Sequence, residues 1–199
     1  MKYKVKKQKP DEDWSSQACC VMASGPSLGW DDYADVRTIE QTGLKTIAVN
    51  STWSVARFCS IIYAGDNNWW RYNAKAIDIK AERWSSSKSS TIPFGTKYRN
   101  HKTRPGYNSG ANAIELAANV MHSPIIILLG FDGSVTKGTH HHGDHKRTSN
   151  PTPDRCKKWQ AQYADVLRLC PDTKIINCSR YTEIKCFERM TLAEALKHV

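Results

Sequence analysis

Pro124-Ile-Ile-Ile-Leu-Leu-Gly130 is the stretch of the sequence that decides the fold. Its five apolar residues follow one another without polar alternation, so both faces of the strand that they predict should be buried. Such a strand lies in the centre of a parallel sheet that helices cover on both sides. The segment Gly130-Phe131-Asp132-Gly133 ends this strand with a turn and a carboxylate.

Further short apolar runs are predicted to form the other strands of this sheet, with helical segments between them. Strands are expected at residues 18–23, 45–50, 60–64, 77–84 and 174–177, and helices at 31–41, 55–59, 69–76, 109–121, 154–169 and 192–198. Gly43 is expected to end the first helix. This alternation predicts an α/β fold: a Rossmann-like, open, mostly parallel sheet with helices on both faces.

The 199 residues are expected to form a single domain, 1–199, with three irregular segments. The first is a basic N-terminal arm at residues 1–15. The second is a flexible polar loop at residues 85–106, which opens with a serine-rich run, and the third is a His-rich loop at 133–153.

Composition narrows the class of protein. No apolar run approaches the roughly 20 residues of a membrane span, and no signal-peptide core follows the basic start, so a cytoplasmic protein is expected. The seven cysteines show no CxxC spacing and are expected to be reduced and buried. The net charge of +10 favours a phosphate, nucleotide or nucleic-acid partner, although a merely basic surface would look the same.

The first strand–helix junction, Ser24-Gly25-Pro26-Ser27-Leu28-Gly29, is a candidate phosphate site. Gly25 would let a ligand approach the backbone, and the next helix would offer free N–H groups and the positive end of its dipole. The segment is neither GxGxxG nor a GxxxxGK[ST] P-loop, and a tight turn could use the same residues.

Polar residues also end the other predicted strands. Asn50-Ser51, Asp66 and Asp132 each follow one of the predicted strands, and ligands of open α/β sheets bind outside the carboxyl ends of the strands. We therefore expect these side chains to meet Ser24 at one edge, although each could be only a helix cap.

Two further features suit a nucleotide. Ser109, followed by Gly110, is expected to cap the Ala-rich helix and to contact a sugar or phosphate. Three tryptophans follow strand ends and would either pack in the core or stack on a base: Trp53, Trp69 and Trp70.

The segment Thr139-His-His-His-Gly-Asp-His145 is the most unusual local feature of the sequence. Its four imidazoles and one carboxylate could supply a general base, bind a metal ion, or form a solvated loop. Gly138 and Gly143 would let the loop close over a ligand.

The order of these motifs resembles small phage-encoded Rossmann-like proteins. The resemblance rests on Ser24-Gly-Pro-Ser-Leu28, Ile47-Ala-Val-Asn50, Tyr63-Ala-Gly-Asp66, Asn108-Ser-Gly110, Leu128-Leu-Gly-Phe-Asp132, the His-Gly-Asp-His loop and Asn150-Pro-Thr-Pro153. More distantly, the opening motif is similar to the start of bacterial lipooligosaccharide-type sialyltransferases. It is also similar to the family that contains motility accessory factors and the archaeal hydroxymethyl-dihydropterin pyrophosphokinase. Ala23-Ser24 stands where these proteins usually have Gly-Asn.

The resemblance to sialyltransferases implies nucleotide contacts at Gly25, Ser27 and Asn50, with a catalytic histidine farther along the chain. A glycosyltransferase that uses a nucleotide sugar is the function we expect, with basic residues near Arg99 and Arg104 neutralising the leaving phosphate. No cofactor is required by the residues themselves, whereas a pyrophosphokinase-like enzyme would need Mg²⁺. A non-catalytic nucleotide or nucleic-acid binding protein is the alternative.

The candidate residues fall into two groups. The candidate catalytic residues are His140, His142, His145 and Asp132. The candidate nucleotide-binding residues are Ser24, Gly25, Ser27, Asn50, Ser51, Asp66, Ser109 and Gly110. For Mg²⁺ the candidate ligands are Asp66 and Asp132.

Overall fold

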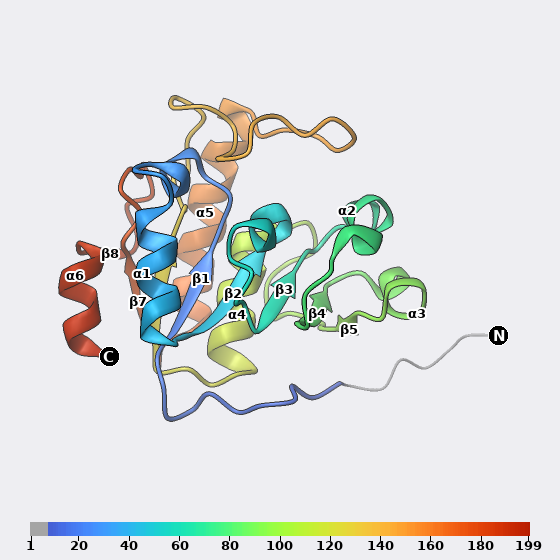
Figure 1. The fold of residues 1–199 in the computed structure, drawn as a ribbon, viewed down its shortest axis with the longest axis horizontal. Helices are drawn as coiled ribbons and strands as arrows, with labels where there is room; N and C mark the ends of the chain where they lie inside the picture. The colour runs from blue at the N-terminus through green and yellow to red at the C-terminus, as the bar shows by residue number, and fades with distance from the viewer. Residues whose placement is uncertain (1–7) are drawn as a thin grey trace.

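The protein is built around one sheet of eight parallel strands, seen in a computed structural model that describes residues 8–199 (Figure 1). The strands lie in the order β5-β4-β3-β2-β1-β6-β7-β8. Their bounds are β1 Cys19–Met22, β2 Lys45–Val49, β3 Ile61–Tyr63, β4 Glu82–Ser85, β5 Lys97–Tyr98, β6 Ile125–Leu129, β7 Lys174–Asn177 and β8 Glu188–Arg189. The expected Rossmann-like α/β fold is confirmed.

The strand predicted to be central is central. β6 pairs with β1 on one side and with β7 on the other, and Ile126–Leu129 are all buried. β1 pairs with β2 on its other side, so the chain order reverses between β1 and β6. Ligands of doubly wound sheets bind at such a reversal, outside the carboxyl ends of the strands.

Helices cover both faces of the sheet. Their bounds are α1 Ala34–Thr42, α2 Asn67–Asn73, α3 Thr91–Phe94, α4 Ser109–Asn119, α5 Pro153–Leu169 and α6 Leu192–Ala195. One core contains side chains of α4 and α5, together with Cys19 and Val21 of β1. The other contains side chains of α1, α2 and α6, with Cys20 and Met22 from the opposite face of the same strand. Period-two alternation along β1 thus divides its side chains between two apolar layers.

Several helix boundaries differ from the predicted ones. The helix expected at 55–59 is instead a 3₁₀ helix at Asn50–Ser54, which starts directly at the end of β2 because Asn50 adopts the left-handed conformation (φ 53°). α1 begins at Ala34 rather than residue 31, because Asp31, Asp32 and Tyr33 all have positive φ. Gly43 ends α1 as expected, with φ 70°.

The segment expected to be a flexible loop at 85–106 contains regular structure. A 3₁₀ helix at Lys88–Ser90, the short helix α3 and the edge strand β5 fall within it. Serine hydroxyls hold this structure together, since Ser90 bonds both the Ser87 carbonyl and the Thr96 hydroxyl. The sequence suggested a loop because hydrogen bonds of serine side chains, and not a periodic pattern of apolar residues, stabilise these short elements. The two-residue strands β5 and β8 were too short to show a period in the sequence.

The C-terminus lies away from the carboxyl edge of the sheet (Figure 1). Residues 1–7 of the expected basic arm lie outside the described residues. The rest of that arm packs against the domain: Trp14 is buried, and its amide donates to the Met121 carbonyl. Among residues 8–199, no helix is long and apolar enough to cross a membrane.

The seven cysteines are free thiols, six of them buried and Cys186 half-buried. Burial raises the pKa of Cys19 and Cys59 to about 12, so these thiols stay protonated at neutral pH. They pack as small apolar side chains in the two cores.

Candidate functional site

A cavity of about 620 Å³ opens at the carboxyl edge of the sheet. It is lined by the residues that follow β1, β2, β3 and β6, by the first turn of α4, by the N-terminal part of α5 and by part of the His-rich loop. The candidate residues that line it are Ser24, Gly25, Asn50, Asp66, Ser109, Gly110, Asp132, His140 and His145. Ser27, Ser51 and His142 are not among the lining residues.

The opening loop is tied to the end of β6 rather than left free for a ligand. The Ser27 amide donates to Asp132 Oδ2 at 2.9 Å, and the Ser27 hydroxyl donates to Oδ1 at 2.6 Å. The Gly25 amide donates to the Gly130 carbonyl, and Pro26 has no N–H. The helix that follows β1 is only a four-residue 3₁₀ turn, Pro26–Gly29. The phosphate site expected there stays a prediction, although the Gly25, Ser27 and Leu28 amides of this loop already donate within the protein.

Gly25 is required by packing. A Cβ on Gly25 would lie 2.4 Å from Asp132 Oδ1 and 2.5 Å from the Gly130 carbonyl oxygen. Its φ of −58° is ordinary, so the close approach of the β6 end is the reason for glycine.

Asp132 is buried, and burial raises its carboxyl pKa to about 6, against the lowering effect of the two bonds from Ser27. Both of its oxygens already accept a hydrogen bond from Ser27. Asp132 therefore positions the opening loop as well as lining the cavity.

The first turn of α4 provides the anion-receptive helix end that the opening loop lacks. Asn108, not Ser109, caps this helix: its side-chain oxygen accepts from the Ala111 amide at 2.9 Å. The Ser109 hydroxyl instead accepts from the Gly65 amide at 3.1 Å, which joins α4 to the end of β3. Within residues 8–199, the Ser109 and Gly110 amides donate no hydrogen bond, and both residues line the cavity.

The ends of β2 and β3 contribute two further polar groups to the cavity. Asn50 lines it from a left-handed backbone position, a conformation that costs energy in most residues and concentrates at functional sites. Asp66 caps α2 with one carboxylate oxygen, which accepts from the Asn68 amide at 2.8 Å. Ser51 points elsewhere, since its hydroxyl accepts from the Trp69 indole at 3.3 Å.

The cations at the cavity come from α5. Arg99, expected to meet a phosphate, instead pairs with the buried Glu115 at 3.0 Å, and neither Arg99 nor Arg104 lines the cavity. Arg155, Lys158, Trp159 and Gln162 of α5 do line it. The sequence carried a signal for them, because their spacing of i, i+3, i+4 and i+7 places all four on one helix face.

The tryptophans that follow strand ends divide between the two expected roles. Trp70 is fully buried, and its indole donates to the Ala64 carbonyl at 2.9 Å, so it belongs to the core. Trp53 packs half-buried against the same core. Trp69 is mostly buried but lines the cavity, as does Trp159.

The His-rich loop is fastened to the opening loop. His140 Nδ1 lies 3.1 Å from the Ser24 hydroxyl, and the His141 amide donates to the Ser24 carbonyl at 3.0 Å. His141 Nδ1 lies 3.2 Å from the Tyr33 hydroxyl. The Nε2 atoms of His140 and His141 are buried without a hydrogen-bond partner.

Burial and mutual proximity keep these imidazoles neutral. Burial, followed by the nearby His145 and His142, lowers the pKa of His140 to about 4. Burial also lowers the pKa of His141 to about 3, and it lowers the pKa values of His142 and His145. The ring nitrogens are therefore available as electron-pair donors at neutral pH.

The described residues fit Mg²⁺ poorly. Mg²⁺ prefers several oxygen ligands, but Asp66 uses one oxygen as a helix cap and Asp132 uses both oxygens on Ser27. Among residues 8–199, the His, Cys, Asp and Glu side chains gather into one potential metal-binding group, and it consists of histidines alone.

Comparison with known proteins adds information at the level of the fold. No protein-family model and no curated protein sequence matches the chain. A solved structure, that of the MAf glycosyltransferase from Magnetospirillum magneticum AMB-1, superposes with a TM-score of 0.60 at 13% sequence identity. The match covers 92% of this chain and 34% of the other, so the chain spans about a third of that protein's length. This structure belongs to a motility accessory factor, the family that the opening motif of the sequence also resembles. The match shows that the two proteins share a fold.

Proposed function

We propose that the protein is a nucleotide-dependent transferase that moves a glycosyl group from a nucleotide sugar. The observation that carries this proposal is the arrangement of the cavity. Groups that suit a phosphate lie on one side of it, at the start of α4 and on α5, and neutral imidazoles of the His-rich loop lie among its other lining residues. The similarity of the fold to part of a glycosyltransferase structure also supports a glycosyl-transfer function.

The phosphates of the donor would bind at the first turn of α4. The free amides of Ser109 and Gly110 and the helix dipole favour an anion there. Arg155 and Lys158 would add the positive charge that a diphosphate requires. Gly110 is required by packing within this turn, since a Cβ there would lie 3.0 Å from the Phe131 ring. Trp159, which is only half-buried, would offer a face for the base.

Transfer of the glycosyl group would then follow in a single displacement step. The acceptor oxygen forms a bond to the anomeric carbon while the bond from that carbon to the phosphate oxygen breaks. The electron pair of the broken bond stays on the phosphate, where the α4 amides and the α5 cations stabilise it. The proton of the acceptor hydroxyl is taken up at the His-rich loop.

A thermal-shift screen against nucleotides and nucleotide sugars tests the binding part of the proposal. A ligand at about 100 times its dissociation constant adds roughly 2.7 kcal/mol to the free energy of unfolding, which a shift in melting temperature reveals. Each stabilising donor is then incubated with candidate acceptors, and products are detected by mass spectrometry. Arms with and without Mg²⁺ separate a pyrophosphokinase-like reaction from glycosyl transfer.

Variants of α5 make the screen specific to the site. Lys158→Ala and Arg155→Ala should each weaken nucleotide affinity about tenfold, equivalent to about 1.4 kcal/mol. Lys157→Ala is the matched control, because Lys157 is exposed on the same helix and does not line the cavity. Equal losses in all three variants would indicate a diffuse charge effect. Binding without turnover of any donor would favour the sequestering protein over the enzyme.

A further inference from the structure

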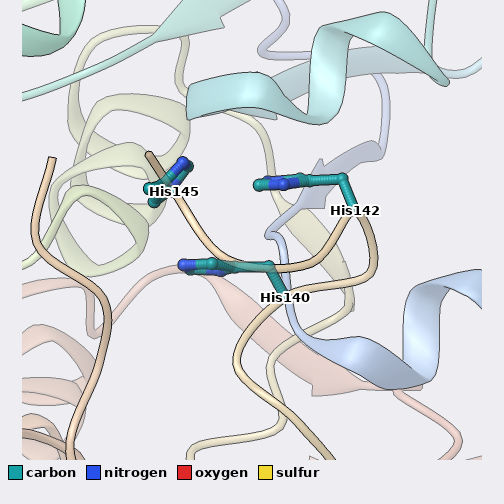
Figure 2. Close-up of side chains that lie close together, drawn as sticks. All are labelled: His140, His142 and His145. Atoms are coloured by element: carbon teal, nitrogen blue, oxygen red, sulfur yellow. The ribbon is translucent and has the colours of Figure 1, made fainter. Parts of the chain in front are cut away.

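Three histidines of the His-rich loop form a compact group: His140, His142 and His145, here called the histidine trio. Their available ligand atoms all lie within 4.8 Å of one another. Figure 2 shows the three rings converging from a single loop. The rings of His140 and His142 are stacked with centroids 5.0 Å apart, and His145 lies 4.4 Å from the first of them and 4.9 Å from the second.

We propose that the histidine trio binds one divalent transition-metal ion, with Zn²⁺ as the expected occupant, and leaves one coordination position open toward the cavity. Tetrahedral Zn²⁺ has Zn–N distances of about 2.0–2.1 Å, which places its ligand nitrogens roughly 3.4 Å apart. The trio is therefore within small side-chain rotations of that geometry. Imidazole nitrogens suit Zn²⁺, Cu²⁺ and Ni²⁺, whereas Mg²⁺ and Ca²⁺ require oxygen ligands.

His140 already has the hydrogen bonding of a metal ligand. Its Nδ1 lies 3.1 Å from the Ser24 hydroxyl, and its Nε2 is buried without a partner. If Nδ1–H donates to Ser24, then Nε2 carries the free electron pair. Metal-bound histidines commonly donate their second nitrogen in this way, which fixes the tautomer and the ring orientation. A buried nitrogen without a partner is costly, and a metal ion would satisfy it.

The backbone around the trio is held in place, in contrast to a solvated loop. The His145 amide donates to the Asn150 side-chain oxygen at 2.7 Å, and the Asn150 amide group donates back to the His145 carbonyl at 3.4 Å. At the other end of the trio, the Gly143 amide donates to the His140 carbonyl and closes a turn.

The number of ligands indicates a catalytic rather than a structural site. Among residues 8–199, no carboxylate or thiolate joins the trio as a fourth ligand. Three protein ligands with one open position are typical of catalytic zinc, whereas structural zinc has four protein ligands. Because His140 and His145 line the cavity, the open position would face a bound ligand.

A consequence of this site rests on the proposed transferase function. An acceptor hydroxyl at the open position would lose its proton more readily, because bound Zn²⁺ lowers the pKa of coordinated water to about 7. With the imidazoles of the trio holding the metal, that proton would pass to water instead of to one of the three histidines. Metal binding itself needs no nucleotide, so the two proposals can fail separately.

Isothermal titration of the full, untagged chain with ZnCl₂ tests the site, since an affinity tag would compete for the metal. We expect one Zn²⁺ per chain, and Co²⁺ substitution should give the strong visible absorption of a tetrahedral site. His140→Ala, His142→Ala and His145→Ala should each weaken Zn²⁺ binding more than 100-fold. Ser24→Ala should weaken it by about 10- to 100-fold, as loss of a ligand's supporting bond does.

The matched control is His141→Gln, which changes the remaining histidine of the same loop and keeps a polar partner for Tyr33. His122→Ala is a second control, at an exposed histidine away from the cavity. Both should bind Zn²⁺ like the wild type, and circular dichroism should confirm that every variant is folded. Unchanged binding in the three trio variants, or equal loss in His141→Gln, would overturn the proposal. Retained Zn²⁺ binding in a protein that binds no nucleotide would overturn only the transferase.

Discussion

Gly25 and Asp132 lie 107 residues apart in sequence and fix the geometry of the opening loop together. The carboxylate accepts two hydrogen bonds from Ser27, and the α-carbon of Gly25 lies directly against it. Gly25, which in the sequence suggested room for a ligand, is thus explained by its close contact with Asp132.

We expect Gly25→Ala to lower the free energy of unfolding by about 1–3 kcal/mol, the usual cost of inserting an atom into a close-packed site. The added Cβ would lie 2.4 Å from Asp132 Oδ1 and 2.5 Å from the Gly130 carbonyl, so one of them must move. Urea unfolding measures the loss. Gly29→Ala is the control, because its Cβ would meet its nearest neighbour, His141 Cβ, at an ordinary 3.4 Å. Equal stability of the two variants would show that Gly25 is not held by packing.

The Asp132 carboxyl predicts a pH dependence of stability. Its pKa is raised from 3.8 to about 6 in the folded protein, so the native state binds the extra proton between these values. Stability therefore falls as pH rises from about 4 to 6, and the cost is fully present above that window. Asp132→Asn cannot ionise; its side-chain oxygen can accept from the Ser27 amide while its NH₂ group donates to the Ser27 hydroxyl, which reverses the direction of that bond.

The stability advantage of Asp132→Asn over the wild type should accordingly grow from pH 4 to pH 7 by up to about 3 kcal/mol, at 1.36 kcal/mol per pKa unit. Urea titrations at four or five pH values measure it. Ser27→Ala should make the loss of stability with rising pH larger than in the wild type, because removing the hydroxyl donor raises the Asp132 pKa further. An advantage that does not change with pH would contradict the assignment.

At the scale of the element, α4 connects the sheet to the cavity. Its residues 110–118 are buried, its first turn lines the cavity, and Ser109 bonds the end of β3. The Asn108 side chain caps the helix and also bonds Gln162 and Tyr163 of α5. One side chain thus contacts both helices that contribute to the proposed phosphate site.

Asn108→Ala should lower the free energy of unfolding by about 0.5–2 kcal/mol, as loss of an N-cap does, and should also weaken nucleotide binding. The ligand effect is expected because the free amides of Ser109 and Gly110 lose their fixed direction. Thr191→Ala removes the capping box of α6, far from the cavity, and should cost similar stability with nucleotide affinity unchanged. Thermal unfolding and titration calorimetry on the same samples compare the two variants. Equal nucleotide affinity in both would separate α4 from the binding site.

At the scale of the whole molecule, the net charge of +10 would attract any polyanion, whereas the cavity of about 620 Å³ has the size of a small-molecule site. We expect a single-stranded oligonucleotide to bind weakly and to dissociate between about 50 and 200 mM salt, because such binding depends on counterion release. A nucleotide should be retained over the same range, since neutral amides and few cations hold it. Fluorescence anisotropy at several salt concentrations measures both. Tight oligonucleotide binding at 200 mM salt would instead favour a nucleic-acid binding protein.

The sequence by itself determined the strands and the class of fold. The apolar runs at β1, β2, β3, β6 and β7 predicted the sheet, because strand formation and burial on both faces leave a local signal in neighbouring residues. The polar residues that end these strands could be placed at one edge for the same reason, since a parallel sheet brings its carboxyl ends together. Local composition failed at residues 85–106, where serine hydroxyls stabilise short elements that have no apolar period.

Only the tertiary structure decided which of these residues are free for a ligand. The Ser27 hydroxyl donates to Asp132, and the Ser24 hydroxyl lies within hydrogen-bond distance of His140, 116 positions away in the sequence. The cations that line the cavity come from α5, whereas Arg99 pairs with Glu115. Pairings of this kind depend on packing between distant elements and on side-chain direction, and neither leaves a periodic pattern along the chain. The clustering of His140, His142 and His145 into ligand distance depended on the same packing, because the opening loop and Asn150 fix the path of the loop that carries them.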